Sequence, residues 1–245
     1  MIVDAHVHIG KSARLQIDCD GAMLVRVADE LGFDKIFATD LTALFYDMQE
    51  GNRLLFEQMR LFPDRIFGYA TLHSTRFGQA ALDELDRCAH SYGMKGLKIY
   101  STPEASIAEP GMIPILEKCV ELGFVILAHT TPVECEYLMT HVPEAKLMMA
   151  HAGGQPWANG NWHRAIQAAQ KHPNLYLETA SSSIDTNFVA TAVRELGAKR
   201  IIFGTDTPLL DPYVQRAKIE ETPISAGERA LIMGGNILRL IGEGA

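Results

Sequence analysis

The chain has 245 residues, of which 47% are hydrophobic and 21% charged, and its formal net charge is −8. This composition is typical of a globular protein, no apolar run approaches the ~18 residues of a membrane helix, and the acidic balance argues against a nucleic-acid-binding surface. The four cysteines have no Cys-x-x-Cys spacing and no signal-peptide pattern opens the chain, so we expect free, buried thiols and a cytoplasmic protein.

Short apolar runs alternate with amphipathic stretches along the whole chain. The predicted strands are 2–8, 35–39, 65–71, 96–100, 124–129, 146–151, 174–178 and 200–205. Helices are predicted near 22–31, 50–61, 78–92, 112–122, 132–141, 162–171, 186–196 and 226–241. The strands are mostly apolar rather than alternating, which indicates a parallel sheet covered on both faces. Eight such units without a linker predict a single (β/α)8 TIM barrel domain, residues 1–245, although an open doubly wound sheet remains the alternative.

The junctions between elements agree with this interpretation. Glu-Leu-Gly precedes a predicted strand three times, with the glycine at Gly32, Gly123 and Gly197, where a helix would end in a left-handed residue. The segment Thr131-Pro-Val-Glu134 reads as a capping box with proline at the first helical position. Helices are therefore expected to begin directly after strands and to stop directly before them.

Two histidines lie two residues apart at the end of the first predicted strand, in Asp4-Ala-His-Val-His8. Side chains with this spacing point to one face of a strand, so we expect His6 and His8 to face the barrel interior while Ala5 and Val7 face the helices. Two imidazoles placed there can bind one metal ion, or they can be core histidines that are hydrogen-bonded to their neighbours.

Further residues of ligand type end three later strands. His129 ends Phe-Val-Ile-Leu-Ala-His, His151 ends Lys-Leu-Met-Met-Ala-His, and Asp206 follows Arg-Ile-Ile-Phe-Gly-Thr. The carboxyl ends of the strands form the active-site face of an α/β barrel. Burial alone predicts apolar residues at these places, so the set predicts a metal centre at that face. Glu178, which ends the seventh strand, is a candidate for orienting the ligands.

Four motifs, taken in this order, resemble the amidohydrolase superfamily, and more closely its amidohydrolase 2 (amidohydrolase-related) branch. They are Asp4-Ala-His-Val-His8-Ile-Gly, Ala150-His-Ala-Gly-Gly154, Gly204-Thr-Asp-Thr-Pro208 and Ile232-Met-Gly-Gly-Asn236-Ile-Leu-Arg-Leu. The resemblance covers the whole chain, and it implies a distorted (β/α)8 barrel that holds one or two divalent metal ions, often zinc. Histidine and carboxylate ligands suit zinc, manganese and iron alike, and zinc is the first expectation.

The same resemblance implies roles for the ligand-type residues. His6, His8, His129 and Asp206 would be metal ligands, and His151 would be a ligand or the catalytic histidine. Asp206 would also take a proton from the attacking water, as in the hydrolases of the superfamily. A carboxylate beside a metal-activated water can accept a proton and later protonate the leaving group.

Lys98 lies in Gly96-Leu-Lys-Ile-Tyr100 on the fourth predicted strand. In two-metal members of the superfamily a lysine on this strand is carboxylated and bridges the metals, and Lys98 matches that position. It can instead be a plain amine that binds an anionic group of the substrate, or a strand-end lysine that reaches solvent. Three further residues are candidates for binding substrate: Tyr100, His73 and Trp157.

The leading interpretation is a metal-dependent hydrolase that cleaves a C–O or C–N bond in a lactone, amide or ester carrying a carboxylate. The branch also contains decarboxylases of aromatic or dienoic acids, which are generally longer than this compact chain. A non-catalytic barrel scaffold is the third possibility, but it would be expected to have lost at least one ligand. The expected partner is a small-molecule substrate, and a homo-oligomer that closes the open mouth is consistent with the short loops.

Overall fold

The computed structural model describes residues 1–73, 77–102, 104–153, 162–181 and 186–243. Within these residues nine strands form one curled sheet in the order β2-β1-β3-β4-β5-β6-β7-β8-β9. The strands are β1 (Val3–Ser12), β2 (Ile17–Cys19), β3 (Lys35–Asp40), β4 (Ile66–Thr71), β5 (Gly96–Tyr100), β6 (Val125–His129), β7 (Lys146–Met149), β8 (Leu175–Glu178) and β9 (Ile201–Ile202). All neighbours pair in parallel except β1 and β2, which form an antiparallel hairpin.

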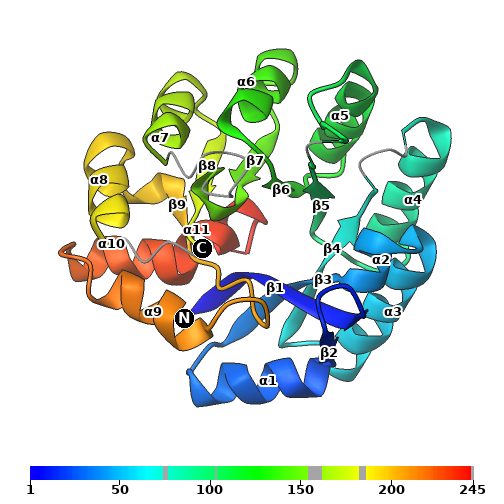
Figure 1. Cartoon of the computed structure of the whole chain (residues 1–245), viewed down its shortest axis with the longest axis horizontal. Coiled ribbons are helices and arrows are strands. Elements are labelled where there is room, and N and C mark those ends of the chain that lie inside the picture. Colours follow the sequence, from blue (N-terminus) through cyan, green and yellow to red (C-terminus); the bar gives the residue numbers. More distant parts are fainter. Residues whose placement is uncertain (74–76, 103, 154–161, 182–185, 244–245) are drawn as a thin grey trace.

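Helices surround these strands, most of them in an outer ring (Figure 1). They are α1 (Gly21–Glu30), α2 (Leu41–Phe45), α3 (Met48–Leu61), α4 (Gln79–His90), α5 (Ile113–Glu121), α6 (Pro132–His141), α7 (Trp162–Lys171), α8 (Thr186–Leu196), α9 (Pro212–Glu220), α10 (Ala226–Ala230) and α11 (Asn236–Leu240). The predicted (β/α)8 barrel is confirmed. In the part of the chain that the structure describes, none of these helices combines the length and the apolar character that crossing a bilayer requires.

The barrel closes where β1 meets the chain that follows β9. The backbone N–H of Ala5 donates to the carbonyl of Phe203 over 3.0 Å, and the N–H of His8 donates to that of Thr207 over 2.7 Å. In the opposite direction, the N–H of Asp206 donates to the carbonyl of His6 over 2.7 Å. These backbone bonds join the first strand to the last one, so the doubly wound alternative is excluded.

A buried carboxylate reinforces this seam. Oδ1 of Asp4 accepts hydrogen bonds from the backbone N–H groups of His6 (3.1 Å) and Thr205 (3.0 Å). Its Oδ2 lies 2.5 Å from the Thr205 hydroxyl, which in turn lies 2.6 Å from the hydroxyl of Thr207. Burial raises the pKa of Asp4 from 3.8 to about 7, although these hydrogen bonds oppose the shift. Asp4 therefore links β1 to the last strand through hydrogen bonds, and burying its carboxyl group has an energetic cost.

The apolar core lies on both sides of the strands. Inside the barrel, Phe37, Tyr69, Leu127 and Met148 pack together, and Ile237 of α11 closes this cluster. A larger cluster fills the space between the strands and the helices. The barrel interior is thus apolar at the amino ends of the strands, which leaves the carboxyl ends for polar side chains.

The predicted direction of Ala5 is wrong. The register between β1 and β3 shifts between Asp4 and Val7, because β1 carries one residue more than its partner there. Ala5 consequently packs in the interior cluster, whereas Val7 packs in the outer one. Since this bulge changes the alternation of side chains, two consecutive residues, Ala5 and His6, face the interior.

Several predicted boundaries also differ from the structure. The sixth predicted strand, which is β7, ends at Met149 rather than at residue 151, and the eighth, which is β9, is ladder-paired only over Ile201–Ile202. The helix predicted over 226–241 is interrupted at Gly234, where a Cβ atom would lie 2.7 Å from the carbonyl oxygen of Met1. Three further elements were not predicted from the sequence: β2, α2 and α9, which lie in the connections after β1, β3 and β9.

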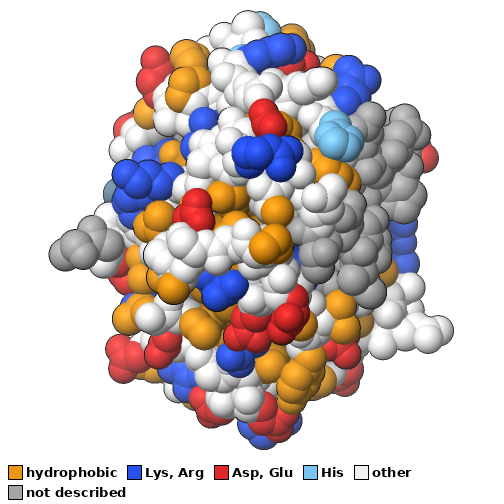
Figure 2. All heavy atoms as spheres, turned by 90° about the vertical axis from the view of Figure 1, so that its left-hand side faces the viewer, with side chains coloured by type: hydrophobic (Ala, Val, Ile, Leu, Met, Phe, Trp, Pro, Cys, Tyr) orange, Lys and Arg blue, Asp and Glu red, His pale blue; other side chains and the backbone are white. Residues whose placement is uncertain are grey.

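The predicted junctions are confirmed. Gly32, Gly123 and Gly197 have φ angles of +62°, +70° and +82°, in the left-handed region that glycine tolerates. Thr131 and Glu134 form the predicted capping box at the start of α6. All four cysteines are free and buried. On the side of the barrel where α8 and α10 lie, acidic and basic side chains are interspersed with hydrophobic ones (Figure 2).

Replacing Asp4 should change how stability depends on pH. With its pKa at about 7 against 3.8 for the ordinary group, folded Asp4 keeps a proton that the unfolded chain releases. Its contribution is therefore fully present below pH 3.8 and is lost as pH rises through about 7. We expect Asp4→Asn, which keeps an acceptor at Oδ1 and can donate to Thr205, to unfold in urea with a free energy that depends less on pH over this interval.

Asp4→Ala leaves the three donors of the seam without an acceptor and should cost about 2–4 kcal/mol in unfolding free energy. Asp18→Asn, a change at an exposed aspartate on β2, is the matched control. A wild-type pH dependence in Asp4→Asn would contradict this account.

Candidate metal centre

Seven polar side chains gather inside the barrel at the carboxyl ends of its strands. All of them are at most 8% exposed, and they are His6, His8, Lys98, His129, His151, Glu178 and Asp206. They come from six of the parallel strands or from the residues that follow them. The structure therefore brings together all the ligand-type residues that the sequence analysis selected, while their roles as ligands stay predictions.

His6, His8 and Asp206 form the first of two groups, among the described residues, that could hold a metal ion. Oδ1 of Asp206 lies 2.9 Å from Nε2 of His8 and 3.3 Å from Nε2 of His6. Three donor atoms from the two strands at the barrel seam thus converge on one point. Two imidazole nitrogens and one carboxylate oxygen are a donor set that suits zinc, manganese or iron.

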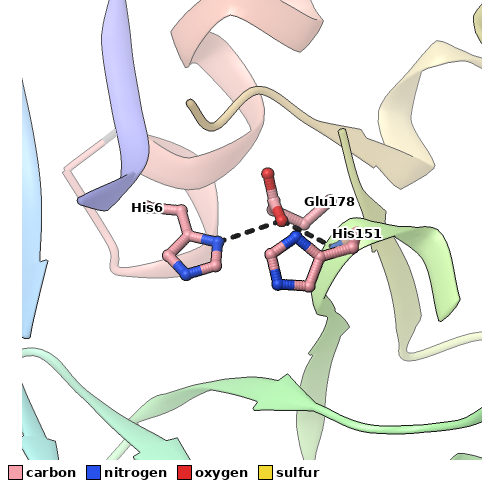
Figure 3. A group of neighbouring side chains, drawn as sticks. All are labelled: His6, His151 and Glu178. Atoms are coloured by element: carbon pink, nitrogen blue, oxygen red, sulfur yellow. Dashed lines mark hydrogen bonds and ion pairs between the residues drawn. The ribbon is translucent and has the colours of Figure 1, made fainter. Parts of the chain in front are cut away.

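His6, His151 and Glu178 form the second group (Figure 3). The carboxylate of Glu178 lies between the other two residues, and its Oε2 accepts from Nδ1 of His6 (3.1 Å) and from the backbone N–H of His151 (3.0 Å). Its Oε1 accepts from the N–H of Ala180 over 2.5 Å. Because these donors already occupy both oxygens, we interpret Glu178 as the residue that orients two histidines, in agreement with its interpretation from the sequence.

The hydrogen bonds set which nitrogen of each ring points at the centre. Nδ1 of His151 lies 2.8 Å from the carbonyl oxygen of Ala180, which can only accept, so Nδ1 carries the proton and Nε2 has a lone pair. Glu178 has the same effect on His6, and Nδ1 of His8 lies 2.9 Å from the hydroxyl of Thr39. An orienting partner on the second nitrogen is the usual arrangement of metal-binding histidines, so these residues fit a metal ion.

Burial keeps His6 and His151 neutral. It lowers the pKa of His6 well below 6.5, with Lys98 acting in the same direction, and it also lowers the pKa of His151. For Asp206, burial alone raises the pKa, but His6, His8 and His151 outweigh it and hold the carboxyl ionised. Neutral histidines beside an ionised carboxylate are the protonation states that metal binding needs.

Two residues of the centre have unusual backbone angles. His151 and Asp206 have φ angles of +57° and +61°, in a region that non-glycine residues rarely occupy. Such strain persists only where the surrounding structure holds it, and it is concentrated at functional sites. Close packing also restricts which residue can stand at position 204, because a Cβ atom on Gly204 would lie 2.4 Å from Oε1 of Glu178.

Lys98 is buried inside the centre rather than at the barrel surface. Its Nζ lies 2.9 Å from Nε2 of His6, and burial lowers its pKa from 10.5 to about 8. The alternative in which Lys98 is a strand-end lysine that reaches solvent is therefore excluded. Lys98 contacts the lone pair of His6 on the side of the ring that faces the centre.

His129 and Tyr100 extend the centre towards the mouth. Nδ1 of His129 lies 3.1 Å from Nε2 of His151, and its ring centroid lies 4.3 Å from that of Tyr100. Neither metal-binding group includes His129. Tyr100 is half-buried and lines a cavity of about 190 Å³ together with His73, Phe45 and Arg14. Trp157 lies outside the described residues.

Several residues around the centre were not predicted from the sequence. Thr39 orients His8, and Arg14 and Phe45 line the cavity beside Tyr100. The position of Thr39 at the end of the second predicted strand was a usable signal, because strand ends meet at the mouth. No sequence signal placed Arg14 there, since the β1–β2 hairpin that carries it was not predicted.

Comparison with known proteins agrees with this geometry. Residues 3–242 match a family model described as Amidohydrolase. No curated protein sequence matches the chain at a significant level.

Solved structures show the same fold at low identity. A 2,6-dihydroxybenzoate decarboxylase, complexed with 2,6-dihydroxybenzoate, has a TM-score of 0.79 at 17% identity, over 98% of both chains. A dihydroxybenzoic acid decarboxylase from Polaromonas sp. JS666, with bound manganese and the inhibitor 2-nitroresorcinol, has a TM-score of 0.77 at 19% identity, over 98% of this chain and 96% of that one. A probable 2-pyrone-4,6-dicarboxylic acid hydrolase from Acinetobacter baumannii, with citric acid bound, has a TM-score of 0.74 at 16% identity, over 98% and 99%.

Removing the orienting carboxylate should weaken metal binding. In Glu178→Gln an NH2 group replaces one carboxylate oxygen, so it faces at least one N–H group that this oxygen accepts from. Two donors then face each other, and the ring of His6 or the turn at His151 must shift. We expect the metal affinity, measured by competition with a chelator, to fall roughly 10–100-fold. Glu84→Gln, a change at another buried glutamate on α4, is the control. Unchanged affinity in Glu178→Gln would show that Glu178 does not orient the ligands.

Proposed function

The chain belongs to the amidohydrolase family, and on that premise we propose that it is a metal-dependent hydrolase of a C–O or C–N bond. The proposed substrate is a small lactone, amide or ester that carries a carboxylate. The observation that carries the proposal is the convergence of His6, His8 and Asp206, with each ring oriented by a partner on its other nitrogen.

The proposed ligands are His6, His8 and Asp206, with His151 and His129 on the side of the centre nearer the mouth. A divalent metal bound there polarises a carbonyl group and lowers the pKa of water, which is the chemistry that hydrolysis needs. Zinc is our first choice, and the manganese in the Polaromonas decarboxylase keeps that metal open.

Asp206 is the proposed proton carrier. Its carboxylate is buried, ionised and in contact with two histidines, so one of its oxygens can accept a proton from the attacking water. The same group then delivers that proton to the departing oxygen or nitrogen. His151 is the proposed second catalytic group, because its Nε2 has a lone pair and points away from the carbonyl that fixes its Nδ1.

We propose that Lys98 acts as an amine that contacts an anionic group of the substrate. It already donates towards Nε2 of His6, and burial lowers its pKa to about 8, which leaves it able to hold or to release a proton near neutral pH. Tyr100 and His73, which line the adjacent cavity, are proposed to contact the body of the substrate.

Decarboxylation of an aromatic acid is the second candidate. Two of the similar structures are described as decarboxylases, and their matches span 96–98% of those chains, so the compact length of this chain does not exclude that reaction. The scaffold hypothesis has less support, because all the ligand types are kept and lie together.

Asp206→Asn should abolish turnover while leaving the fold intact. The amide matches the carboxylate in size but cannot carry the proton, so we expect kcat to fall at least a hundredfold, on the order of what general acid–base catalysis contributes. The measurement is hydrolysis of a panel of lactones, amides and esters, with the metal content determined in parallel. A normal rate at normal metal content would rule out the proton role.

Turnover in ¹⁸O-labelled water distinguishes the two reactions. Hydrolysis places one labelled oxygen in the organic product, whereas decarboxylation of aromatic or dienoic acids releases carbon dioxide and leaves that product unlabelled. We expect the labelled product. Release of carbon dioxide without incorporation would overturn hydrolysis and establish the second candidate.

Metal content tests the role of Lys98. Because three side-chain donor atoms converge in the first group, whereas both oxygens of Glu178 in the second accept from N–H groups, we expect about one metal ion per chain in protein purified with bicarbonate and without chelator. Lys98→Met should keep that ion and lose turnover. About two ions in the wild type and one in Lys98→Met would instead show a carboxylated lysine that bridges two metals.

A further inference from the structure

A hairpin that the sequence did not reveal carries a cationic side chain to the barrel mouth. Beyond His8, β1 continues to Ser12, turns and returns as β2. Arg14 lies in this turn, and its guanidinium carbon lies 5.6 Å from the ring centroid of Phe45 at the end of α2. A cation held over an aromatic ring keeps its charge while its position is restricted.

Arg14 has no acidic partner among the described residues, where the ion pairs involve other cations. Lys11 on the same hairpin is paired with Asp18 over 2.9 Å, so the two cations of this segment differ in that respect. The chain as a whole has an excess of eight negative charges, which makes an unpaired arginine at the mouth more notable. Its guanidinium has five N–H donors, a geometry that matches a carboxylate.

A cavity extends from this arginine to Tyr100, whose ring contacts His129 of the metal centre. It has a volume of about 190 Å³, and its lining includes Arg14, Phe45, Leu72, His73 and Tyr100. Among the described residues that line it, Arg14 alone has a permanent charge. Along one wall, the ring of Phe45 lies 6.1 Å from that of Tyr100, whose ring lies 4.3 Å from that of His129.

We propose that Arg14 binds the carboxylate of the substrate at the outer end of this cavity, with the apolar body of the substrate against Phe45 and Leu72 and its reacting group towards His129. This subsite deepens the proposed function, on which it rests for the identity of the ligand as a substrate. The cavity favours a small compound with a flat or branched apolar body and an anionic end at Arg14, separate from the anionic group that Lys98 is proposed to contact inside the centre.

Benzoate is a suitable probe, because it combines a flat apolar ring with a carboxylate, and benzamide is its uncharged counterpart. Their dissociation constants are measured by calorimetry on the protein as purified, for the wild type, Arg14→Gln, Arg14→Lys and the control Lys11→Gln. We expect Arg14→Gln to bind benzoate roughly tenfold more weakly, as the loss of one charged hydrogen-bonding partner predicts. Arg14→Lys should bind with intermediate affinity, and Lys11→Gln like the wild type.

Two further results are expected if Arg14 holds the carboxylate. Added salt should weaken benzoate binding in the wild type more than in Arg14→Gln, because an exposed charge pair is screened. Benzamide should bind weakly to both proteins. Equal benzoate affinity in the wild type and Arg14→Gln, equal affinity for benzoate and benzamide, or no detectable binding of benzoate to the wild type would each overturn the subsite.

The binding measurement does not require turnover, so it separates the two proposals. Weakened benzoate binding in Arg14→Gln, with unchanged metal content, supports the subsite even if no hydrolysis is found. Conversely, hydrolysis with labelled oxygen in the product, together with normal benzoate binding in Arg14→Gln, would leave the proposed function standing without the subsite. Once a substrate is known, Arg14→Gln should raise KM more than it lowers kcat.

Discussion

The seam between the first strand and the last is the constraint on which the site depends. Three backbone hydrogen bonds and the buried carboxylate of Asp4 hold β1 against the chain that follows β9. This seam carries His6 and His8 on one side and Asp206 on the other, and the three donor atoms meet only because the barrel is closed. The positive φ of Asp206 is a local cost of that closure, and the seam offsets it with the bond from the Asp206 N–H to the carbonyl of His6.

The interior of the barrel divides into an apolar layer and a polar one. Phe37, Tyr69 and Met148 fill the half towards the amino ends of the strands, where α11 closes the barrel. Above them, the histidines, Lys98 and two carboxylates are buried together, and each satisfies part of another's hydrogen-bonding capacity. Burial keeps His6 and His151 neutral, while Asp206 stays ionised against the effect of its own burial. A buried network of this kind is stable only as a unit, because removing one member leaves the others unsatisfied.

The barrel strands and the residues at their ends provide the polar groups of the centre, whereas the choice of substrate depends on the connections around the mouth of the barrel. Similar folds at 16–19% identity include decarboxylases and a probable hydrolase, so the barrel alone does not select the reaction. In this chain the β1–β2 hairpin brings Arg14 to the mouth, and α2 brings Phe45. Both elements are short insertions between a strand and the next helix, which is where an α/β barrel varies its specificity.

The amino-acid sequence by itself determined the barrel, the junctions of its helices and the residue types of the metal centre. The apolar runs, the three Glu-Leu-Gly junctions and the ligand-type residues at strand ends are local patterns, so they can be read without knowing what lies opposite. Only the tertiary structure decided the bulge in β1 that turns both Ala5 and His6 inward, and the turn that gives His151 its positive φ. It also decided which carboxylate faces the centre, since Glu178 accepts from His6 Nδ1 while Asp206 lies beside His6 Nε2. Sequence patterns missed the hairpin at Arg14 because a three-residue strand without a Gly-containing turn has no periodicity to detect. These features depend on contacts between residues up to 201 positions apart, and such contacts exist only once the barrel has closed.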